Sequence, residues 1–453
     1  MQAINPATEE RLKEYADHST EQMNELINST NEAFKAWRET SFEHRASLMK
    51  KAAQLLRDKK VELGALMTAE MGKPLADGEG EAEKCAWVCD FYADNAEEFL
   101  TPELIDTDAA KSYVSYQPLG IVFAIMPWNF PLWQVFRFAA PGLMAGNAGL
   151  LKHAPNVPGC AQAIEDIFLE AGFPKNIFTN LFIDTDQAAE VIANPLVKAV
   201  TLTGSTRAGK AVAKKAGEHL KKCVLELGGS DPYIVLEDAD LDEAVKTCAT
   251  SRLINNGQSC ISAKRFIVPE SIKTQFEEKL VEAMSAYQMG DPTDRSNQLG
   301  TMAREDLRDE LAKQVDRSIA AGARCILGGK VPDQKGFYYP ATILTDVKKG
   351  TPAYEEEMFG PVASIIAVKD EAEAIEVAND SIYGLGAAIF SKDTKKAEEI
   401  AETKLQAGAC FVNSFVKSDP RLPFGGINES GFGRELSHHG IKEFMNAKTV
   451  YVK

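Results

Sequence analysis

The chain has 453 residues, of which 45% are hydrophobic and 26% are charged, a composition typical of soluble globular proteins. At roughly 150 residues per domain, this length predicts two or three domains with a large buried core. The 66 acidic residues outnumber the 50 basic ones and give a formal charge of −16, which disfavours binding to nucleic acids and to anionic membranes.

The eight cysteines include no CxxC pair and are accompanied by only six histidines, so neither a disulfide framework nor a metal site is expected. The N-terminus lacks the basic and apolar regions of a secretory signal. Ser112–Phe136 carries no charge and is long enough to span a bilayer, but Pro118, Pro127 and Pro131 divide it into short pieces. We therefore expect a cytoplasmic protein that does not associate with membranes.

The first half of the chain predicts a helical region followed by alternating strands and helices. Before residue 105, the clearest helices are Thr20–Trp37, Ser41–Lys60 and Glu81–Phe99. Strands are then predicted at Ile121–Met126, Gly149–Lys152, Ile177–Ile183, Val197–Thr203 and Cys223–Leu227, with helices at Ala161–Ala171 and Arg207–Leu220. Strands separated by helices of this length indicate right-handed βαβ units and a parallel, doubly wound sheet.

A second α/β series is predicted from about Ile234 onward. Its helices are Leu241–Leu253, Ile272–Ala286 and Ala303–Ala321, and its strands include Ala363–Val368 and Gly408–Asn413. Lys111–Gln117 and Thr449–Lys453 read as isolated strands. Because an unpaired strand edge is a liability, we expect each to pair with another subunit or with a distant part of the chain.

Three residues have surroundings that favour catalysis. Cys260 follows the polar turn Asn256–Ser259, where a thiol would be exposed and backbone N–H groups would lower its pKa. Glu226 lies in an apolar strand, which should raise its pKa and suit it to act as a general base. Asn129 follows a buried strand between two prolines, where its amide could donate to an oxyanion. The alternatives are a buried structural cysteine, an outward-facing glutamate and a turn-forming asparagine.

A weak anion-binding signal occurs at Gly204-Ser205, which follows a strand and opens a helix. No acidic residue stands at the end of the second strand, where a dinucleotide-binding fold usually places one for the ribose. Lys152 and His153 occupy that place, and a cation there suits a ribose hydroxyl or a 2′-phosphate.

Six ordered motifs resemble those of the aldehyde dehydrogenase superfamily, and the resemblance covers nearly the whole chain. They are Pro127–Pro131, Gly204-Ser205, Glu226–Gly229, Gly257–Cys260, Glu357–Pro361 and Pro423–Gly426. Within the superfamily, the chain is similar to the short bacterial succinate-semialdehyde dehydrogenases, notably at Phe136–Phe138 and Lys417–Arg421. The resemblance implies two doubly wound α/β domains and a small bridging β-strand element for oligomerisation into a homodimer or homotetramer.

The implied domains are a dinucleotide-binding domain (1–104 and 119–227), a catalytic domain (228–441) and oligomerisation strands (105–118 and 442–453). Cys260 would attack the aldehyde, the Asn129 amide and the Cys260 N–H would hold the oxyanion, and Glu226 would activate water to hydrolyse the thioester. The residues implied to bind the cofactor, NADP or NAD, are Trp128, Lys152, Pro155, Gly204, Ser205, Leu227, Glu357 and Phe359.

One departure from the family pattern bears on the cofactor. Where the family usually has Pro-Ser-Glu after the lysine, this chain has His153-Ala154-Pro155. The missing glutamate removes an acid that would repel a 2′-phosphate, so NADP is allowed and NAD is not excluded.

The expected substrate is a small aldehyde that carries a carboxylate. Arg137 follows Asn129 by eight residues, about two helical turns, and has apolar neighbours, so its guanidinium needs an anionic partner. That partner is either an acidic side chain or, as the resemblance favours, the distal carboxylate of succinic semialdehyde. The other residues expected to contact the substrate are Trp133, Ser418, Phe424 and Arg421.

Three other functions stay open from the sequence. One is oxidation of a different small aldehyde. Another is a coenzyme-A-acylating dehydrogenase, a branch that lacks the general-base glutamate seen here as Glu226. The third is a catalytically silent homologue, which the joint presence of Cys260, Glu226 and Asn129 disfavours.

Overall fold

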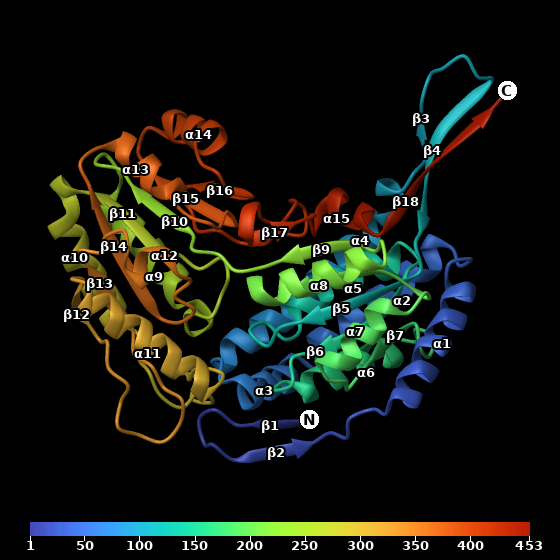
Figure 1. The fold of residues 1–453 in the computed structure, drawn as a ribbon, viewed down its shortest axis with the longest axis horizontal. Coiled ribbons are helices and arrows are strands. Elements are labelled where there is room, and N and C mark those ends of the chain that lie inside the picture. Colours follow the sequence, from blue (N-terminus) through green and yellow to red (C-terminus); the bar gives the residue numbers. More distant parts are fainter.

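The computed structural model describes residues 1–453 and contains two α/β units and a projecting strand arm (Figure 1). The first unit is built on a six-stranded sheet of order β17-β9-β8-β5-β6-β7. These strands are β5 (Ile121–Met126), β6 (Ala148–His153), β7 (Phe178–Asn180), β8 (Val197–Thr203), β9 (Lys222–Glu226) and β17 (Gly431–Phe432). All pairings are parallel except the antiparallel pairing of β17 with β9, so the predicted parallel sheet is confirmed.

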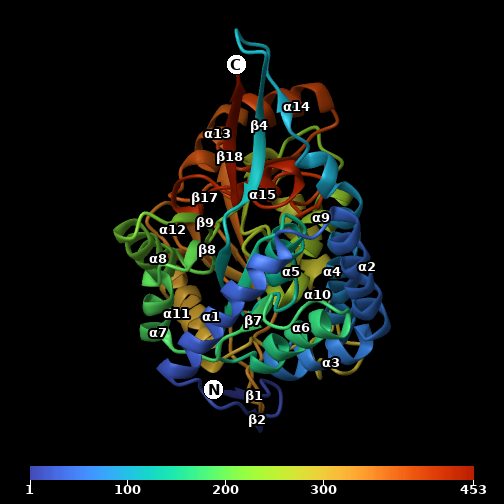
Figure 2. The ribbon, with the colours of Figure 1, turned by 90° about the vertical axis from the view of Figure 1, so that its right-hand side faces the viewer.

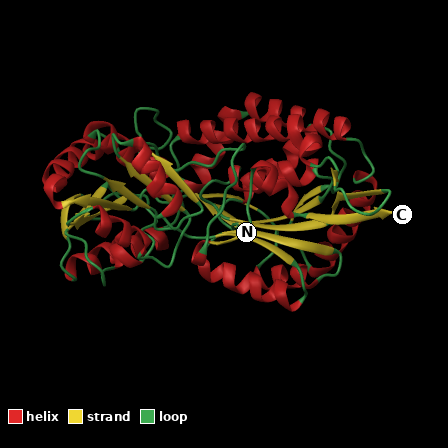
Figure 3. Ribbon diagram, turned by 90° about the horizontal axis from the view of Figure 1, so that it is seen from above, coloured by secondary structure: helices red, strands yellow, loops and turns green.

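Helices cover both faces of this sheet (Figure 3). They are α1 (Thr20–Trp37), α2 (Phe42–Asp58), α3 (Lys60–Met71), α4 (Leu75–Phe99), α5 (Trp133–Met144), α6 (Pro158–Glu170), α7 (Thr185–Ala193) and α8 (Thr206–Glu218). None of the chain's helices is long and apolar enough to cross a membrane.

The second unit is built on a seven-stranded sheet of order β12-β13-β14-β11-β10-β15-β16, with only β12 antiparallel to its neighbour. Its strands are β10 (Pro232–Val235), β11 (Arg265–Pro269), β12 (Arg324–Leu327), β13 (Thr342–Thr345), β14 (Val362–Val368), β15 (Gly386–Phe390) and β16 (Ala409–Val412). Its helices are α9 (Leu241–Leu253), α10 (Glu270–Ser285), α11 (Glu305–Ala320), α12 (Pro352–Glu355), α13 (Glu371–Asn379) and α14 (Thr394–Thr403). Tyr233 and Val235 pack on one face and Ile234 on the other, as the two-residue period of a strand requires.

The two strands predicted to be isolated pair with each other. β4 (Lys111–Pro118) runs antiparallel to β18 (Met445–Val452) along its whole length, with β3 (Glu103–Leu104) on its other side. These strands form an arm that projects from the first unit (Figures 1 and 2), and the outer edge of β18 has no neighbouring strand. The short helix α15 (Ser437–Glu443) leads into the arm, and a hairpin of β1 (Gln2–Ile4) and β2 (Arg11–Glu14) lies at the N-terminus.

Most predicted elements agree with the structure to within a few residues. The largest difference at a helix start is at α4, which begins at Leu75 and not at Glu81. The sequence did not predict this first turn as helical because it contains Gly78, and glycine disfavours helices. A Cβ at Gly78 would lie 2.8 Å from the Cα of Gly64 in α3, so the glycine allows the two helices to pack closely. At β7, the strand spans only Phe178–Asn180 and not the predicted Ile177–Ile183, because β6 pairs with it over three residues only.

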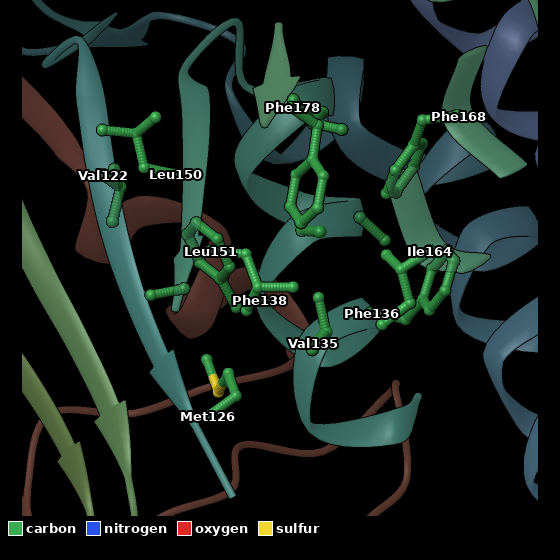
Figure 4. Packing of buried hydrophobic residues seen from close by; sticks show 14 of the residues in the cluster. Val122, Met126, Val135, Phe136, Phe138, Leu150, Leu151, Ile164, Phe168 and Phe178 are labelled. Atoms are coloured by element: carbon green, nitrogen blue, oxygen red, sulfur yellow. The ribbon is translucent and has the colours of Figure 1, made fainter. Parts of the chain in front are cut away.

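Helix α5 is buried on all sides, and its packing fixes the residues that it presents to the site. Figure 4 shows its phenylalanines against β6, β7 and α6. The rings of Phe136 and Phe168 are 5.2 Å apart, and those of Phe168 and Phe178 are 4.9 Å apart. This apolar contact belongs to a core cluster of 65 residues that includes strands β5 and β6.

The N-terminus of α5 is capped by a glutamate from another helix. Glu81 of α4 accepts hydrogen bonds from the backbone N–H groups of Leu132 at 2.8 Å and Trp133 at 2.9 Å. Its carboxylate also pairs with Lys73, and both side chains are almost fully buried. The negative charge is well placed because free N–H groups and the helix dipole make this end of α5 positive.

Replacing Glu81 should destabilise the fold because it leaves Lys73 buried without an ionic partner. We expect Glu81→Gln to lower the free energy of unfolding by about 3–5 kcal/mol. Equilibrium urea denaturation, followed by tryptophan fluorescence, measures this change in the free energy of unfolding. The control Lys35→Ala breaks the exposed pair with Glu32 and should cost less than about 1 kcal/mol. Equal losses in the two variants would contradict a stabilising role for the buried pair.

Candidate active site

A cavity of about 300 Å³ opens where the two units meet, and Cys260 lies in its wall. It is lined by α4 and α5 of the first unit and by two loops of the second. Of the predicted site residues, the structure brings Trp133, Arg137, Cys260, Ser418 and Phe424 together here. Arg421 does not line the cavity: its guanidinium pairs with Asp419 at 2.7 Å.

The loop before Cys260 is held in a conformation that few residues adopt. Asn255, Asn256 and Gly257 follow α9 with φ values of 54°, 56° and 72°. A Cβ at Gly257 would lie 2.3 Å from the carbonyl carbon of Gly360, so only glycine fits there. The Asn256 amide anchors the loop through the carbonyls of Gly72 at 3.1 Å and Thr301 at 2.9 Å.

Two buried cations whose roles were not predicted from the sequence bind carbonyls around the thiol. Lys264 donates to the carbonyls of Ser259 at 2.9 Å and Cys260 at 2.7 Å, and its Nζ lies 3.4 Å from Glu357. Arg252 donates to the carbonyl of Ala263 at 2.9 Å. In the sequence, the only indication of this role is that Lys264 follows Cys260 by four residues. The residues next to Lys264 do not indicate that its side chain is buried.

The expectation of a lowered pKa for Cys260 is wrong. Burial raises the pKa of the thiol to about 12, although the charges of Lys264 and Arg137 act in the opposite direction. The thiol lines the cavity but is half-buried, and the apolar wall disfavours the thiolate more than the cations favour it. A proton acceptor is therefore needed to make this sulfur nucleophilic.

Asn129 lies at the base of the same loop. Its side-chain N–H donates to the carbonyl of Gln258 at 3.1 Å, and its own backbone carbonyl accepts from Asn255 at 2.7 Å. The side chain is buried, and one of its two N–H bonds stays available for another acceptor. An amide fixed in this way suits the stabilisation of an oxyanion that forms next to Cys260.

Glu226 ends strand β9 and is 2% exposed. Neither carboxylate oxygen has a hydrogen-bond partner. Burial raises the pKa of this carboxyl well above its usual value, and the nearby Glu435 raises it further, whereas Arg137 and Arg434 lower it. The raised pKa predicted from the sequence is confirmed, and it makes the ionised Glu226 a stronger base than a solvent-exposed carboxylate.

Arg137 is paired with an acidic side chain inside the protein. Its Nε contacts Glu435, Nη2 lies 3.3 Å from the hydroxyl of Thr203, and the guanidinium lies 4.6 Å from the ring centre of Phe424. The ion-pair alternative considered for Arg137 is therefore present in the structure. A further contact from Arg137 into the cavity must use its Nη atoms.

The residues implied to bind a dinucleotide lie on both sides of the junction between the units. Gly204 directly follows β8, and Ser205 caps α8 by accepting from the N–H of Ala208 at 3.3 Å. Glu357 accepts from the N–H of Gly229 at 3.0 Å. Phe359 meets Trp128 edge-on, with ring centres 5.8 Å apart.

Lys152 lies at the end of β6 and is half-buried, makes no ion pair, and has its pKa lowered by burial. Pro155 is exposed nearby, and Leu227 is buried against α8. The adjacent His153 is not a second cation, because burial lowers its pKa to about 4. A free lysine, a helix N-terminus and a carboxylate are the groups that phosphates and ribose hydroxyls require, so this set fits a nicotinamide dinucleotide.

Comparisons with known proteins agree with this geometry. The model of the aldehyde dehydrogenase family matches residues 1–450. A protein from Synechocystis described as a probable NADP-dependent succinate-semialdehyde dehydrogenase is 50% identical, over 99% of both chains. An Escherichia coli succinate semialdehyde dehydrogenase described as NAD(P)-dependent is 47% identical, over 99% of this chain and 97% of that protein.

The fold has an equally close match among solved structures. Succinic semialdehyde dehydrogenase from Streptococcus pyogenes, solved with NADP, superposes with a TM-score of 0.98 at 40% identity and covers 100% of this chain and 99% of that one. The chain therefore belongs to the aldehyde dehydrogenase family. The fold class expected from the sequence is confirmed.

Because the Glu226 carboxylate has no hydrogen-bond partner, it is free to bind a water molecule, and its role in thioester hydrolysis can be tested. If Glu226 serves hydrolysis of the thioester, Glu226→Gln should still give a rapid burst of about one reduced nicotinamide per site and then stall. Stopped-flow absorbance measures the burst, with Cys260→Ala as the control that should show none. A Glu226→Gln variant without a burst would place this carboxylate at an earlier step.

Proposed function

We propose that the protein oxidises succinic semialdehyde, or a similar small carboxylated aldehyde, to the acid with NADP or NAD. The observation that carries the proposal is that Cys260, Arg137 and Ser418 line the same cavity. A thiol and donors for a carboxylate in one pocket suit a substrate with an aldehyde at one end and an acid at the other. The relatives named for this reaction support the same choice.

In the proposed mechanism, the thiol proton of Cys260 passes to solvent in the cavity, and the sulfur attacks the aldehyde carbon. Burial makes this proton loss costly, because it raises the pKa of the thiol to about 12. The free N–H of Asn129 and the backbone N–H of Cys260 hold the oxyanion of the resulting thiohemiacetal. A nicotinamide dinucleotide, when bound, would supply the hydride acceptor that allows the thiohemiacetal to become a thioester on Cys260. Glu226 then removes a proton from water as the water attacks the thioester, and the acid is released.

The cofactor would be held by this chain's residues on both sides of the junction. Lys152 and the N-terminus of α8 would bind the ribose and phosphates, and Glu357 the nicotinamide ribose, with Phe359 beside the nicotinamide ring. Pro155 carries no negative charge, so we infer that NADP is used at least as well as NAD.

Two alternatives are separated by one assay. A coenzyme-A-acylating enzyme needs a second thiol to release its product, and a silent homologue gives no product. Succinic semialdehyde with NADP or NAD and without coenzyme A should give continuous formation of reduced nicotinamide. No turnover under these conditions would overturn the proposal. We further propose that the protein is cytoplasmic and forms a homodimer or homotetramer through the β4–β18 arm, whose outer edge is open.

Removing the guanidinium of Arg137 tests its role towards the substrate. We expect Arg137→Leu to lower kcat/KM for succinic semialdehyde by a factor equivalent to roughly 2–5 kcal/mol. The measurement compares this substrate with butanal, which has the same chain length and no carboxylate. Because the variant also leaves Glu435 unpaired, a loss common to both aldehydes reports the ion pair, and only the additional loss reports the carboxylate. Equal losses would limit Arg137 to a structural role.

A charge reversal near Lys152 tests the cofactor assignment. We expect Pro155→Glu to raise the KM for NADP far more than that for NAD, because the new carboxylate repels the 2′-phosphate. Steady-state kinetics with both cofactors measure the effect. Pro155→Gln is the control, with similar size and no charge. A similar rise for both cofactors would remove position 155 from the recognition of the 2′-phosphate.

A further inference from the structure

A second cation in the substrate cavity was not identified from the sequence. Lys84 of α4 lines the cavity together with Trp133, Arg137 and Ser418. Its Nζ donates to the hydroxyl of Ser418 at 2.8 Å and lies 4.2 Å from the ring centre of Trp133. The ammonium group is therefore held at a defined place in the wall, between a hydroxyl and an aromatic face.

Lys84 differs from Arg137 because it has no carboxylate partner. Arg137 is neutralised by Glu435. The acids closest to Lys84 are already engaged: Glu81 pairs with Lys73 and caps α5, and Asp419 pairs with Arg421. An ammonium that is half-buried beside an aromatic ring lacks full hydration, so an anion that enters the cavity gains from its charge.

We propose that Lys84 is a specificity-determining residue that binds the distal carboxylate of the aldehyde substrate, together with Ser418. The inference rests on the proposed function, since it assumes a carboxylated aldehyde. It changes the division of roles in the cavity: Lys84 supplies the uncompensated positive charge, and Arg137 supplies donors whose charge Glu435 already balances. The hydrogen bond between Lys84 and Ser418 joins α4 to the loop that carries Ser418, so both segments would contact the carboxylate.

Titration of Lys84 offers a readout that a structural role would not produce. Burial lowers the pKa of Lys84 to about 8, and the charge of Arg137 lowers it further, whereas Cys85, Glu81 and Asp419 raise it. Lys417, which is exposed on the loop before Ser418, also lines the cavity. Above about pH 8, a growing fraction of the free enzyme would carry a neutral amine and bind a carboxylate less well.

The experiment measures kcat/KM for succinic semialdehyde divided by kcat/KM for butanal. Both aldehydes use the same thiol and the same base, and the ratio does not depend on the fraction of active protein, so poor folding of a variant does not affect it. We expect Lys84→Met to lower this ratio about ten- to hundred-fold, the range for losing a hydrogen bond to a charged group. Lys84→Arg, which keeps a cation, should retain most of the ratio.

The pH dependence and a matched variant complete the test. In the wild type, the ratio should fall as the pH rises above about 8, and in Lys84→Arg it should stay level because a guanidinium does not lose its proton in this range. Lys417→Met removes the same charge from the same cavity, but at an exposed side chain without a hydrogen bond, and should change the ratio less than about three-fold.

The outcomes separate this inference from the proposed function. If the wild type shows no preference for succinic semialdehyde over butanal, the proposed function fails and the inference fails with it. If the wild type prefers the acid but Lys84→Met keeps the ratio, only the assignment of Lys84 is overturned. An equal fall of the ratio in Lys417→Met would likewise overturn it, because the effect would then come from the general charge of the cavity.

Discussion

The capping of α5 by Glu81 is the interaction on which the site depends. This one carboxylate holds the first N–H groups of α5 and neutralises Lys73, so it fixes the start of the helix that carries Trp133 and Arg137. The remaining surface of α5 packs in the largest apolar cluster of the chain. A helix constrained at its end and along all its faces holds its side chains in one arrangement, which a cavity of defined shape requires.

Burial has opposite uses for the two central groups of the site. It raises the pKa of Glu226, which makes the carboxyl a better proton acceptor once ionised, and it raises the pKa of Cys260, which makes the thiol a poorer nucleophile on its own. The same buried environment therefore raises the pKa of both groups, which favours proton uptake by Glu226 and disfavours ionisation of Cys260. Lys264 limits the rise in the pKa of Cys260, because its positive charge lies next to this residue and donates to its carbonyl.

The regular elements could be predicted from the sequence because their signals are local. The apolar runs of β5 and β8 gave the observed bounds, and so did the amphipathic patterns of α1 and α9. What could not be predicted depends on contacts between distant segments. The partner of Arg137 lies almost three hundred residues later at Glu435, and Lys84 meets Ser418 only after both units have folded. The pKa of Cys260 was misjudged for the same reason, since a polar sequence around a thiol does not show what packs over it.

The pairing of β4 with β18 has a consequence for how the chain is made. The two strands are joined in register although more than three hundred residues separate them, and β17 returns to β9 after about two hundred residues. On the ribosome, β4 emerges long before β18 exists, so the edge of β4 that β18 will cover stays unpaired while the second unit is synthesised. Such long-range pairings slow folding. The last residues to leave the ribosome therefore complete the first unit. A polypeptide released before these residues are made would expose the edge of β9 that β17 covers and the edge of β4 that β18 covers.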